Sequence, residues 1–284
     1  RSKYSKVHLS EITIDNVIYA LDSTTISTSI KLAAWAFGKY SKGAVKMHTL
    51  LDLRGSIPAN IHITDGKWHD SNELDELTPE PFAFYVMDKA YVDFKALFRF
   101  HRAEAWWVSR PKENMKFKTL AQLQIPEETK GVVEDSRIKV TGHKSNKLYP
   151  EDMRFVRVYD PDNDTIVDFI SNNFEVSALE ISNLYRHRWD IEVFFKWIKQ
   201  NIVIKYLWGY SENAVKVHLW TAIISYLTIA RIRADYESPY SITEVATLIR
   251  ISALERTELR TLITKRKNQI SSPYANELSL FDDF

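Results

Sequence analysis

The chain has 284 residues, of which 45% are hydrophobic and 26% are charged, and its formal net charge is +1. This composition excludes a disordered or collagen-like chain, and the absence of cysteine excludes disulfide scaffolds, zinc–cysteine sites, iron–sulfur clusters and thiol nucleophiles. No apolar run approaches the roughly 20 residues that cross a bilayer, and the first residues do not form a signal peptide. We therefore expect a soluble intracellular protein, preceded by a missing N-terminal part because the chain begins at Arg1 without methionine.

The first part of the chain carries two short apolar runs that each end in a carboxylate. Residues 16–22 end in Asp22, and residues 82–88 end in Asp88. Continuous apolar runs of this length are typical of strands buried on both faces. Between them the pattern predicts strands at 45–53 and 57–63 joined as a hairpin, and a short helix over 71–77 capped by Ser71.

Strand-like character dominates the middle of the chain. A helix at 94–103 and a strand at 105–109 are expected first. The segment from 111 to about 173 then contains short strand-like runs separated by turn signals. These runs begin at Gly131, Arg137, Met153 and Thr165. We interpret the segment as a β-rich insertion that interrupts a mixed α/β domain.

Helical periodicity dominates the remainder. Ser177 and Glu180 fit a capping box at the start of a helix that is expected to continue to Gln200. Further helical stretches are expected at 214–234 and 241–267.

Charge is unevenly distributed along the chain. Residues 185–267 hold 14 Lys or Arg against 8 Asp or Glu, whereas residues 65–93 are acidic. This distribution suits a protein that holds both a polyanion and a divalent cation. Two solvated faces of opposite sign explain the charges equally well.

Asp22 and Asp88 are the first candidate site residues. The carboxyl ends of parallel strands meet at one edge of an open α/β sheet, and neighbouring strands lie about 4.8 Å apart. Two unpaired carboxylates near a core repel each other and are penalised by desolvation, and a divalent metal ion removes both objections. Each aspartate alone is better explained as a turn cap, but the repetition of the pattern favours a metal site.

The expected helix after Ser177 presents a second set of candidates. Tyr185, Arg188, Glu192 and Lys199 are spaced by 3, 4 and 7 residues, which places them within an arc of about 60°. Lys196 and Trp189 project near the same edge. A neighbouring stripe is expected to pack into the core, and consists of Ile191, Phe194, Phe195, Ile198 and Ile202. A row of surface ion pairs is the alternative explanation of the spacing.

Together these residues resemble the DDE transposases of bacterial insertion sequences. The resemblance rests on the strand that ends in Asp22, on Met87-Asp88-Lys-Ala-Tyr91 and on the spacing of residues 185, 188, 192 and 199. The insertion-sequence-four type, which is defined by a Tyr-Arg-Glu-Lys signature, is the most similar. The flanking segments 46–48, 64–70 and 188–196 add to a resemblance that covers roughly residues 15–230. Ala90 departs from the pattern, since many relatives have glycine there.

The resemblance implies an α/β fold, with an RNase H-like mixed sheet flanked by helices and interrupted by a β-rich insertion. Residues 1–110 would form the first part of the catalytic domain and residues 111–175 the insertion subdomain. Residues 176–284 would supply the second part of the catalytic domain, with the glutamate helix, and a helical C-terminal region.

The resemblance also implies a DNA transposase that cleaves and joins transposon ends by metal-dependent phosphoryl transfer. Asp22, Asp88 and Glu192 would be the catalytic, metal-binding triad that holds two Mg²⁺ ions, for which Mn²⁺ substitutes. A second set would bind DNA through phosphate contacts along the helix: Tyr185, Arg188, Lys199, Lys196 and Trp189. Aromatic candidates for stacking a flipped base are Trp189, Phe117 and Phe155, for which core packing is the alternative.

The partners that follow are double-stranded DNA with terminal inverted repeats, target DNA and a second copy in a homodimeric synaptic complex. The expected location is the bacterial cytoplasm, at the nucleoid and without a membrane. The sequence leaves open the terminal-repeat sequence, the excision route, the dimer interface and a missing N-terminal DNA-binding segment.

Two alternative functions and one motif remain. The same fold serves structure-specific nucleases without strand transfer, and a transposase-derived chain can bind DNA without catalysis. The pair His69-Asp70 is also found in metal-dependent phosphohydrolases, but His48, His62 and His101 lack the spacing that those enzymes require. We therefore interpret His69 as a supporting or structural residue.

Overall fold

The computed structural model describes residues 12–27, 43–126, 129, 131–161, 163–201, 209 and 211–264. Within these residues one mixed sheet has the strand order β3-β2-β1-β4-β5-β9-β8-β7-β6. The strands are β1 (Ile18–Ser27), β2 (Ala44–Asp52), β3 (Ile57–Asp65), β4 (Phe84–Met87), β5 (Trp106–Ser109), β6 (Phe117–Gln122), β7 (Val132–Val140), β8 (Met153–Asp160) and β9 (Thr165–Ser171).

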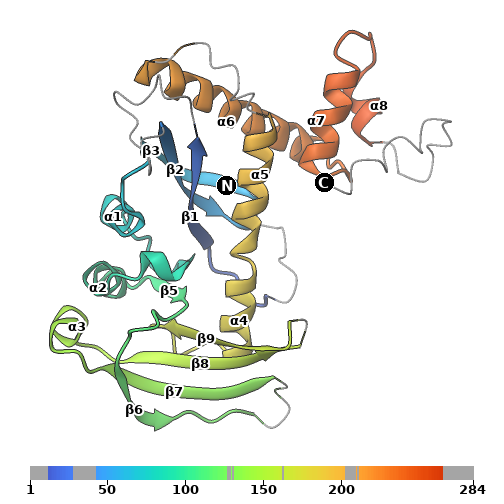
Figure 1. The fold of residues 1–284 in the computed structure, drawn as a ribbon. Helices are drawn as coiled ribbons and strands as arrows, with labels where there is room; N and C mark the ends of the chain where they lie inside the picture. Colours follow the sequence, from blue (N-terminus) through green and yellow to red (C-terminus); the bar gives the residue numbers. More distant parts are fainter. Residues whose placement is uncertain are drawn as a thin grey trace. The chain divides into compact units, whose positions relative to one another are not determined.

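The helices lie between and after these strands in the described part of the chain (Figure 1). They are α1 (Asp70–Glu76), the 3₁₀ helix η3 (Lys89–Tyr91), α2 (Phe94–Arg102), α3 (His143–Leu148), α4 (Ala178–Arg186), α5 (Trp189–Asn201), α6 (Glu212–Asp235), α7 (Ile242–Ile251) and α8 (Leu259–Thr264). The chain divides into two compact units, residues 1–218 and 219–284.

The two apolar runs that end in aspartates form the centre of the sheet. β1 and β4 pair in parallel from Ile18↔Phe84 to Leu21↔Met87, and β4 pairs in parallel with β5. The paired residues of β1 and β4 are almost fully buried, as their continuous apolar sequence requires. The prediction of two adjacent, parallel, buried strands is therefore confirmed.

The predicted hairpin is also confirmed. β2 and β3 pair antiparallel, and β2 pairs antiparallel with β1. Ser56 has a φ of 51°, so the turn between β2 and β3 uses the left-handed region at a non-glycine residue.

The β-rich segment continues the same sheet. β9 pairs antiparallel with β5 through Val108↔Ser171 and Ser109↔Ile170, and β8, β7 and β6 follow outward in antiparallel order. Two runs that were expected as separate strands, from Gly131 and from Arg137, belong to the single strand β7. Strand β6 and helix α3 were not expected.

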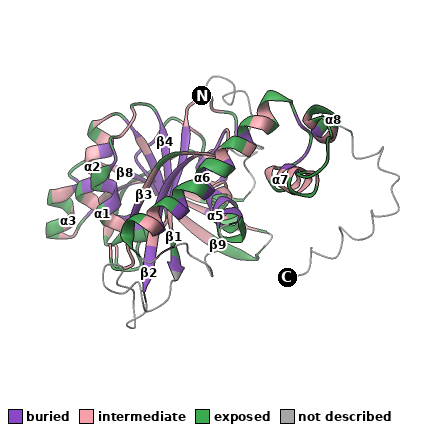
Figure 2. Cartoon of the chain, turned by 90° about the horizontal axis from the view of Figure 1, so that it is seen from above, coloured by how far each residue is buried: buried purple, intermediate pink, exposed green. Residues whose placement is uncertain are grey.

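Helices cover both faces of the sheet in the first unit. Helices α1, α2 and α3 lie on one face, and α4 and α5 lie on the other (Figures 1 and 2). Most of the purple, buried positions in Figure 2 lie on the strands between these two helical layers. Helix α2 begins where Asp93 accepts a hydrogen bond from the N–H of Ala96, as a side-chain cap does. Ser71 does not cap α1; His69 stands at the N-cap position, without a side-chain hydrogen bond there.

The expected continuous helix from Ser177 to Gln200 is wrong, because the chain forms two helices. Helix α4 ends at Arg186 and α5 begins at Trp189, and Figure 1 shows them end to end. The N–H groups of Arg188 and Ile191 bond to carbonyls three residues back, at 3.0 Å and 3.3 Å, which tightens the chain into a 3₁₀-like turn. The apolar spacing on either side is preserved, so periodicity does not reveal the break.

The predicted capping box is half confirmed. Ser177 Oγ accepts a hydrogen bond from the N–H of Glu180, as predicted. The Glu180 carboxylate accepts instead from the N–H and the hydroxyl of Thr13, at 2.9 Å and 2.8 Å. This glutamate therefore ties the start of α4 to the segment that leads into β1.

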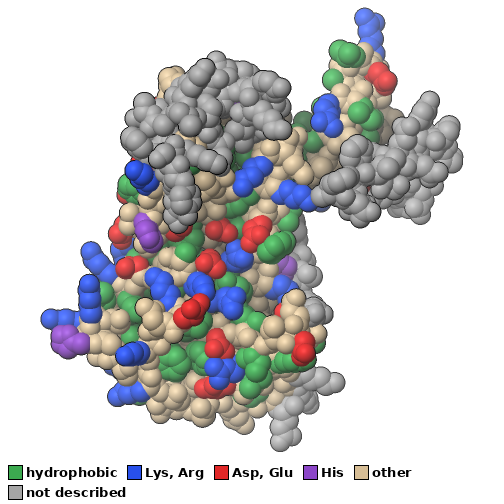
Figure 3. All heavy atoms as spheres, viewed as in Figure 1, with side chains coloured by type: hydrophobic (Ala, Val, Ile, Leu, Met, Phe, Trp, Pro, Cys, Tyr) green, Lys and Arg blue, Asp and Glu red, His purple; other side chains and the backbone are tan. Residues whose placement is uncertain are grey.

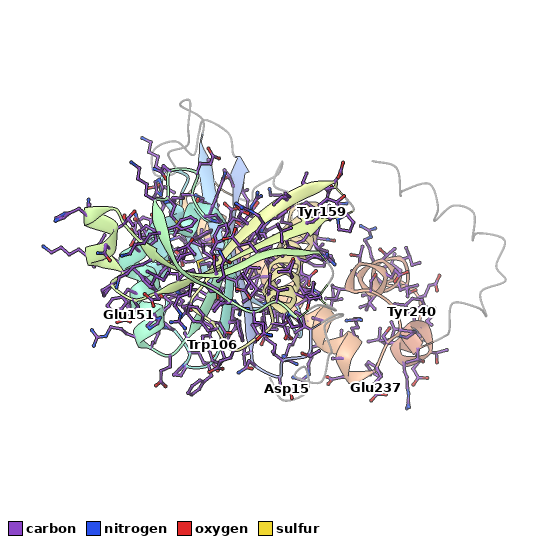
Figure 4. All side chains as sticks on the ribbon, turned by 90° about the horizontal axis from the view of Figure 1, so that it is seen from below. Asp15, Trp106, Glu151, Tyr159, Glu237 and Tyr240 are labelled. Atoms are coloured by element: carbon purple, nitrogen blue, oxygen red, sulfur yellow. The ribbon has the colours of Figure 1, made fainter. Side chains whose placement is uncertain are left out.

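The described part of the second unit, up to residue 264, is helical. Tyr240, Val245 and Ile263 form its small buried core (Figure 4 labels Tyr240). The prediction of one helical stretch over 241–267 is wrong for the described residues, because α7 and α8 are separated by residues 252–258. Helix α6, which spans both units, is long and apolar enough to cross a membrane, with a mean hydropathy of 1.2. Soluble proteins contain helices of the same length and composition, so this property alone assigns no membrane.

Candidate active site

Asp22 and Asp88 lie next to each other in the sheet. Each directly follows a residue of the last β1–β4 pair, Leu21↔Met87. Asp88 stands just after β4 and caps η3 by accepting a hydrogen bond from the N–H of Ala90 at 3.0 Å. Asp22 is not at the end of its strand as expected, because β1 continues to Ser27 and pairs with β2 along that length.

Arg188 connects Asp22 to Glu192. Its Nη1 donates to Asp22 Oδ2 at 2.9 Å, and its Nη2 donates to Glu192 Oε1 at 2.9 Å. The Arg188 and Asp22 side chains are 15% and 20% exposed, so this contact lies mostly out of water. Arg188 and Glu192 were expected on one face of a helix. They are in contact as expected, although Arg188 lies in the break between α4 and α5.

The electrostatics of this group are dominated by burial. Burial raises the pKa of Asp22 to about 6, with further increases from the negative charges of Glu192 and Asp88. The backbone N–H of Ser23 and the guanidinium of Arg188 act in the opposite direction. Burial also opposes the charge on Arg188, but Tyr185 and the two carboxylates outweigh it and raise the Arg188 pKa. Glu192 and Asp88 are therefore both close enough to Asp22 for their charges to act on its pKa.

The three carboxylates line two cavities, Asp22 and Glu192 one and Asp88 the other. A cavity of about 470 Å³ is lined by Asp22, Ser23, Thr24, Glu192, Phe195, Lys196, Lys199 and Gln200. A second cavity of about 410 Å³ includes Asp88, Lys89 and Lys112 among its lining residues. Asp88 does not line the first cavity. Figure 3 shows acidic and basic side chains interspersed on the face that carries β1 and α5.

The donor set suits a divalent cation in type, since Mg²⁺ and Mn²⁺ prefer carboxylate oxygens. Within the described ranges, however, no three Asp, Glu or His side chains are close enough to form a ready-made metal site. The guanidinium of Arg188 supplies the positive charge between Asp22 and Glu192 instead. The arrangement is thus a half-buried acidic group neutralised by an arginine.

The remaining predicted residues lie around this group. Tyr185 is on α4, and its ring centroid is 5.7 Å from Arg188 Cζ. Burial raises the Tyr185 pKa, so its phenol is neutral and able to donate a hydrogen bond. Lys196 and Lys199 are exposed and line the larger cavity. Trp189 is 61% exposed at the start of α5.

The stacking candidates outside α5 behave differently from Trp189. Phe155 is only 2% exposed, and its ring lies 5.2 Å from that of Phe117. Both rings belong to the packed interior of the sheet. Four residues of the predicted core stripe on α5 are buried: Ile191, Phe194, Phe195 and Ile198. The fifth, Ile202, lies outside the described residues.

A second polar cluster beside Asp22 was not assigned from the sequence. Asp70 Oδ1 accepts hydrogen bonds from Ser23 Oγ at 2.6 Å and from the Tyr91 hydroxyl at 3.4 Å. Lys46 Nζ lies 2.7 Å from the same oxygen. We name Ser23, Lys46, Asp70 and Tyr91 the Asp70 cluster. Lys46 and Asp70 stand in two of the flanking segments of the resemblance, which was the available signal.

His69 does not join this cluster through any contact found among the described residues. Its Nδ1 lies 3.3 Å from Ser71 Oγ, next to the start of α1.

Comparison with known proteins identifies a family with which these features agree. The model of the transposase DDE domain matches residues 14–228. The chain is 34% identical over 209 residues to a protein of Sinorhizobium fredii described as transposase y4zB, which covers 72% of this chain and 58% of that protein. It is 29% identical over 209 residues to the transposase of insertion sequence element IS5377 of Geobacillus stearothermophilus, covering 74% of this chain and 55% of that protein.

Another relative and a solved structure are also similar to this chain. A protein of Synechocystis described as a transposase for insertion sequence element IS4SA is 30% identical over 217 residues, which cover 75% of this chain and 59% of that protein. A solved piggyBac transposase synaptic complex with hairpin DNA aligns over 87% of this chain and 50% of its own, with a TM-score of 0.45 and 11% identity. That structural similarity is too low to establish a shared fold. The chain spans less than two thirds of the length of each relative.

Proposed function

Since this chain belongs to the transposase DDE domain family, we propose that it is the catalytic part of a DNA transposase. It cleaves the ends of a mobile element and joins them to target DNA by metal-dependent phosphoryl transfer. We further propose that it is of the insertion-sequence-four type, that its fold is RNase H-like, and that two ends are held by a dimer. The strand order β3-β2-β1-β4-β5, with parallel β1, β4 and β5, supports the fold assignment.

One observation carries the proposed chemistry. Residues 166 positions apart, Arg188 and Asp22, form an ion pair of 2.9 Å, and the same arginine contacts Glu192. Asp88 follows the neighbouring strand and adds its charge to that pair. Asp22 and Glu192 line one cavity together, and the charge of Asp88 reaches Asp22 from the end of the neighbouring strand, which supports a shared acidic site.

Asp22, Asp88 and Glu192 are the residues that would hold the metal ions. Bound metal supplies activation of a water or 3′-hydroxyl nucleophile and neutralisation of the leaving oxygen. The chain's contribution is to hold Asp22 and Glu192 against Arg188, with Asp88 at the end of the neighbouring strand. Burial raises the pKa of Asp22 to about 6. A cation that approaches this carboxylate stabilises its ionised form.

Basic side chains around the cavity would bind the nucleic acid. Lys196 and Lys199 line it from α5 and place two positive charges next to the acids. A phosphate backbone is attracted by such charges, and arginine suits paired contacts to phosphate oxygens. Tyr185 adds a neutral hydroxyl donor. These side chains would orient a DNA end across the cavity that Asp22 and Glu192 line.

The test is cleavage of DNA that carries the ends of the encoding element, in Mg²⁺ or Mn²⁺. Asp22→Asn, Asp88→Asn and Glu192→Gln should each abolish nicking without weakening DNA binding. The matched control is Asp75→Asn, because Asp75 is an exposed carboxylate on α1. Wild-type nicking by two of the three variants would contradict the proposal.

The products separate the remaining alternatives. Joined products between an end and a target DNA are expected from a transposase. Cleavage without joining would instead indicate a nuclease of the same fold. DNA binding without metal-dependent cleavage would indicate a non-catalytic descendant.

A further inference from the structure

We propose that Asp70 is a positioning residue that links the two chain segments carrying Asp22 and Asp88, an inference that rests on the proposed function. Asp70 begins α1, directly outside the group of three acids. Its carboxylate contacts neighbours from β1, β2 and the region of η3. One side chain thereby connects elements that are far apart in the sequence.

The contact to β1 acts on Asp22 through Ser23. Ser23 Oγ donates to Asp70 Oδ1 at 2.6 Å, while the Ser23 backbone N–H donates to Asp22 Oδ1 at 2.7 Å. Ser23 therefore binds Asp70 through its side chain and Asp22 through its backbone N–H. Loss of the Asp70 carboxylate would free the Ser23 side chain and loosen the strand at Asp22.

The contact to η3 acts on the Asp88 segment through Tyr91. Tyr91 is three residues after Asp88, and its N–H bonds to the Asp88 carbonyl at 3.0 Å. Its hydroxyl donates to Asp70 Oδ1 at 3.4 Å, and the side chain is buried, at 1% exposure. Burial, together with the charges of Asp70 and Asp22, raises the pKa of Tyr91, so the phenol remains a donor.

Lys46 makes this arrangement stable. Burial alone would raise the pKa of Asp70, but hydrogen bonds from Lys46 and Ser23 outweigh it and lower that pKa. Burial and Lys46 also lower the pKa of His48 to about 4, so the imidazole is neutral at pH 7 and Lys46 balances the Asp70 charge. Asp70 is thus a carboxylate whose charge is balanced within the protein by Lys46.

A purely local role in α1 explains these contacts less well. An acid in the first turn of a helix interacts favourably with the helix dipole without needing contacts to other elements. The Asp70 carboxylate instead contacts three residues outside α1, which are Ser23, Lys46 and Tyr91. The contacts with Ser23 and Tyr91 are what a positioning role requires.

The helix itself supplies a matched control. Glu73 lies three residues further along α1 and is 2% exposed. Its Oε2 lies 2.8 Å from His62 Nδ1 on β3. Glu73→Gln therefore alters a buried carboxylate of the same helix without touching Ser23 or Tyr91.

The experiment measures hydrogen exchange and nicking for the 284-residue chain and for Asp70→Ala, Asp70→Asn and Glu73→Gln. We expect Asp70→Ala to increase amide exchange in both segments, 18–27 and 84–92. It should also lower the nicking rate at saturating DNA by about 10- to 100-fold with unchanged DNA affinity, since a small misplacement of reacting groups has effects of this size. Asp70→Asn keeps an acceptor oxygen. Its amide exchange and its nicking rate should therefore lie between those of the unaltered chain and those of Asp70→Ala.

Each outcome decides one claim. Faster exchange in only one segment or in neither, or the same response in Glu73→Gln, would overturn the positioning role. A nicking rate unchanged by Asp70→Ala would overturn it as well. If the unaltered chain does not nick DNA at all, the proposed function fails, while the exchange pattern still decides whether Asp70 links the segments. If Asp70→Ala does not fold, Asp70→Asn and the single-contact variants Ser23→Ala and Tyr91→Phe supply the same comparison.

Discussion

Two arginines in this molecule bind carboxylates in opposite ways. Arg154 on β8 forms a paired contact with Asp135, at 2.9 Å and 2.7 Å, and also donates to the carbonyls of Asn173 and Val176. Both side chains are nearly inaccessible, at 5% and 4% exposure. Arg188 instead shares single hydrogen bonds between Asp22 and Glu192, and its Nε is buried without a hydrogen-bond partner among the described residues.

The difference separates a contact closed within the protein from a contact beside a cavity. The Arg154 site is closed, since its donors are used within the protein and fix the segment that leads to the cap of α4. The Arg188 site is open, because its acids line a cavity and only one guanidinium neutralises them. A closed site is expected to affect stability, whereas an open site is expected to respond to ions and to DNA.

The largest effect should come from breaking the closed site. Asp135→Asn removes the charge that pairs with the buried Arg154, and loss of one partner of such a pair destabilises a protein by about 3–5 kcal/mol. Urea unfolding measures the change. The control Asp235→Asn removes an exposed helical pair with Arg231 and should change stability by only about 0.3–0.5 kcal/mol. Equal effects of the two variants would invalidate the distinction.

The open site should show itself in the pH dependence of stability. The pKa of Asp22 is raised to about 6 in the folded chain from 3.8, so the folded state binds this proton more tightly. The contribution of Asp22 to stability therefore falls as pH rises from about 4 to about 6, by up to roughly 3 kcal/mol.

Asp22→Asn removes this titration. Its stability should therefore fall less than that of the unaltered chain between pH 4 and pH 7, as urea unfolding in EDTA would measure. If the stability of the two proteins changes equally with pH, the ionised form of Asp22 does not destabilise the folded chain.

Removal of the bridging arginine should alter metal affinity. Arg188→Gln frees Asp22 and Glu192 from a guanidinium that competes with a cation for the same oxygens. Because charge-assisted hydrogen bonds contribute about 1.5–3 kcal/mol, Mn²⁺ should bind roughly 10- to 150-fold more tightly, as measured by calorimetry without DNA. Arg137→Gln is the control, since that arginine pairs with Asp152 on the β-rich side. Weaker Mn²⁺ binding by Arg188→Gln would mean that the arginine supports the metal site.

The smallest expected effect concerns DNA. Lys199→Ala removes one positive charge from the cavity lined by Asp22 and Glu192, and should weaken DNA binding a few-fold. The slope of log affinity against log salt should fall by about 1, as for one lost phosphate contact. Lys95→Ala, an exposed lysine on α2, should leave the slope unchanged. An unchanged slope for Lys199→Ala would remove this lysine from the proposed DNA path.

The sequence was sufficient where chemistry and pattern are local. The apolar runs before Asp22 and Asp88 specify adjacent buried strands, and the spacing of Arg188 and Glu192 places them in contact. The break between α4 and α5 was not predictable, because apolar residues keep their spacing across a tightened turn.

Contacts that depend on the register of distant strands were also missed. Asp135 meets Arg154 only because β7 and β8 pair in a register that places Asp135 opposite Val156. Asp70 reaches Ser23 only through the packing of α1 beside β1. Neither pairing leaves a periodic signal in the sequence.

The central claim is that Asp22, Asp88 and Glu192 together bind the catalytic metal. Iron(II) in place of Mg²⁺, supplied with hydrogen peroxide and ascorbate, reduces the peroxide to hydroxyl radicals that cut the polypeptide close to the bound ion, and the cut positions can be identified by mass spectrometry. We expect cuts near residues 22, 88 and 192 in the presence of a DNA end, suppressed by excess Mg²⁺. Cuts confined to another part of the chain, or cuts that Mg²⁺ does not suppress, would contradict the account.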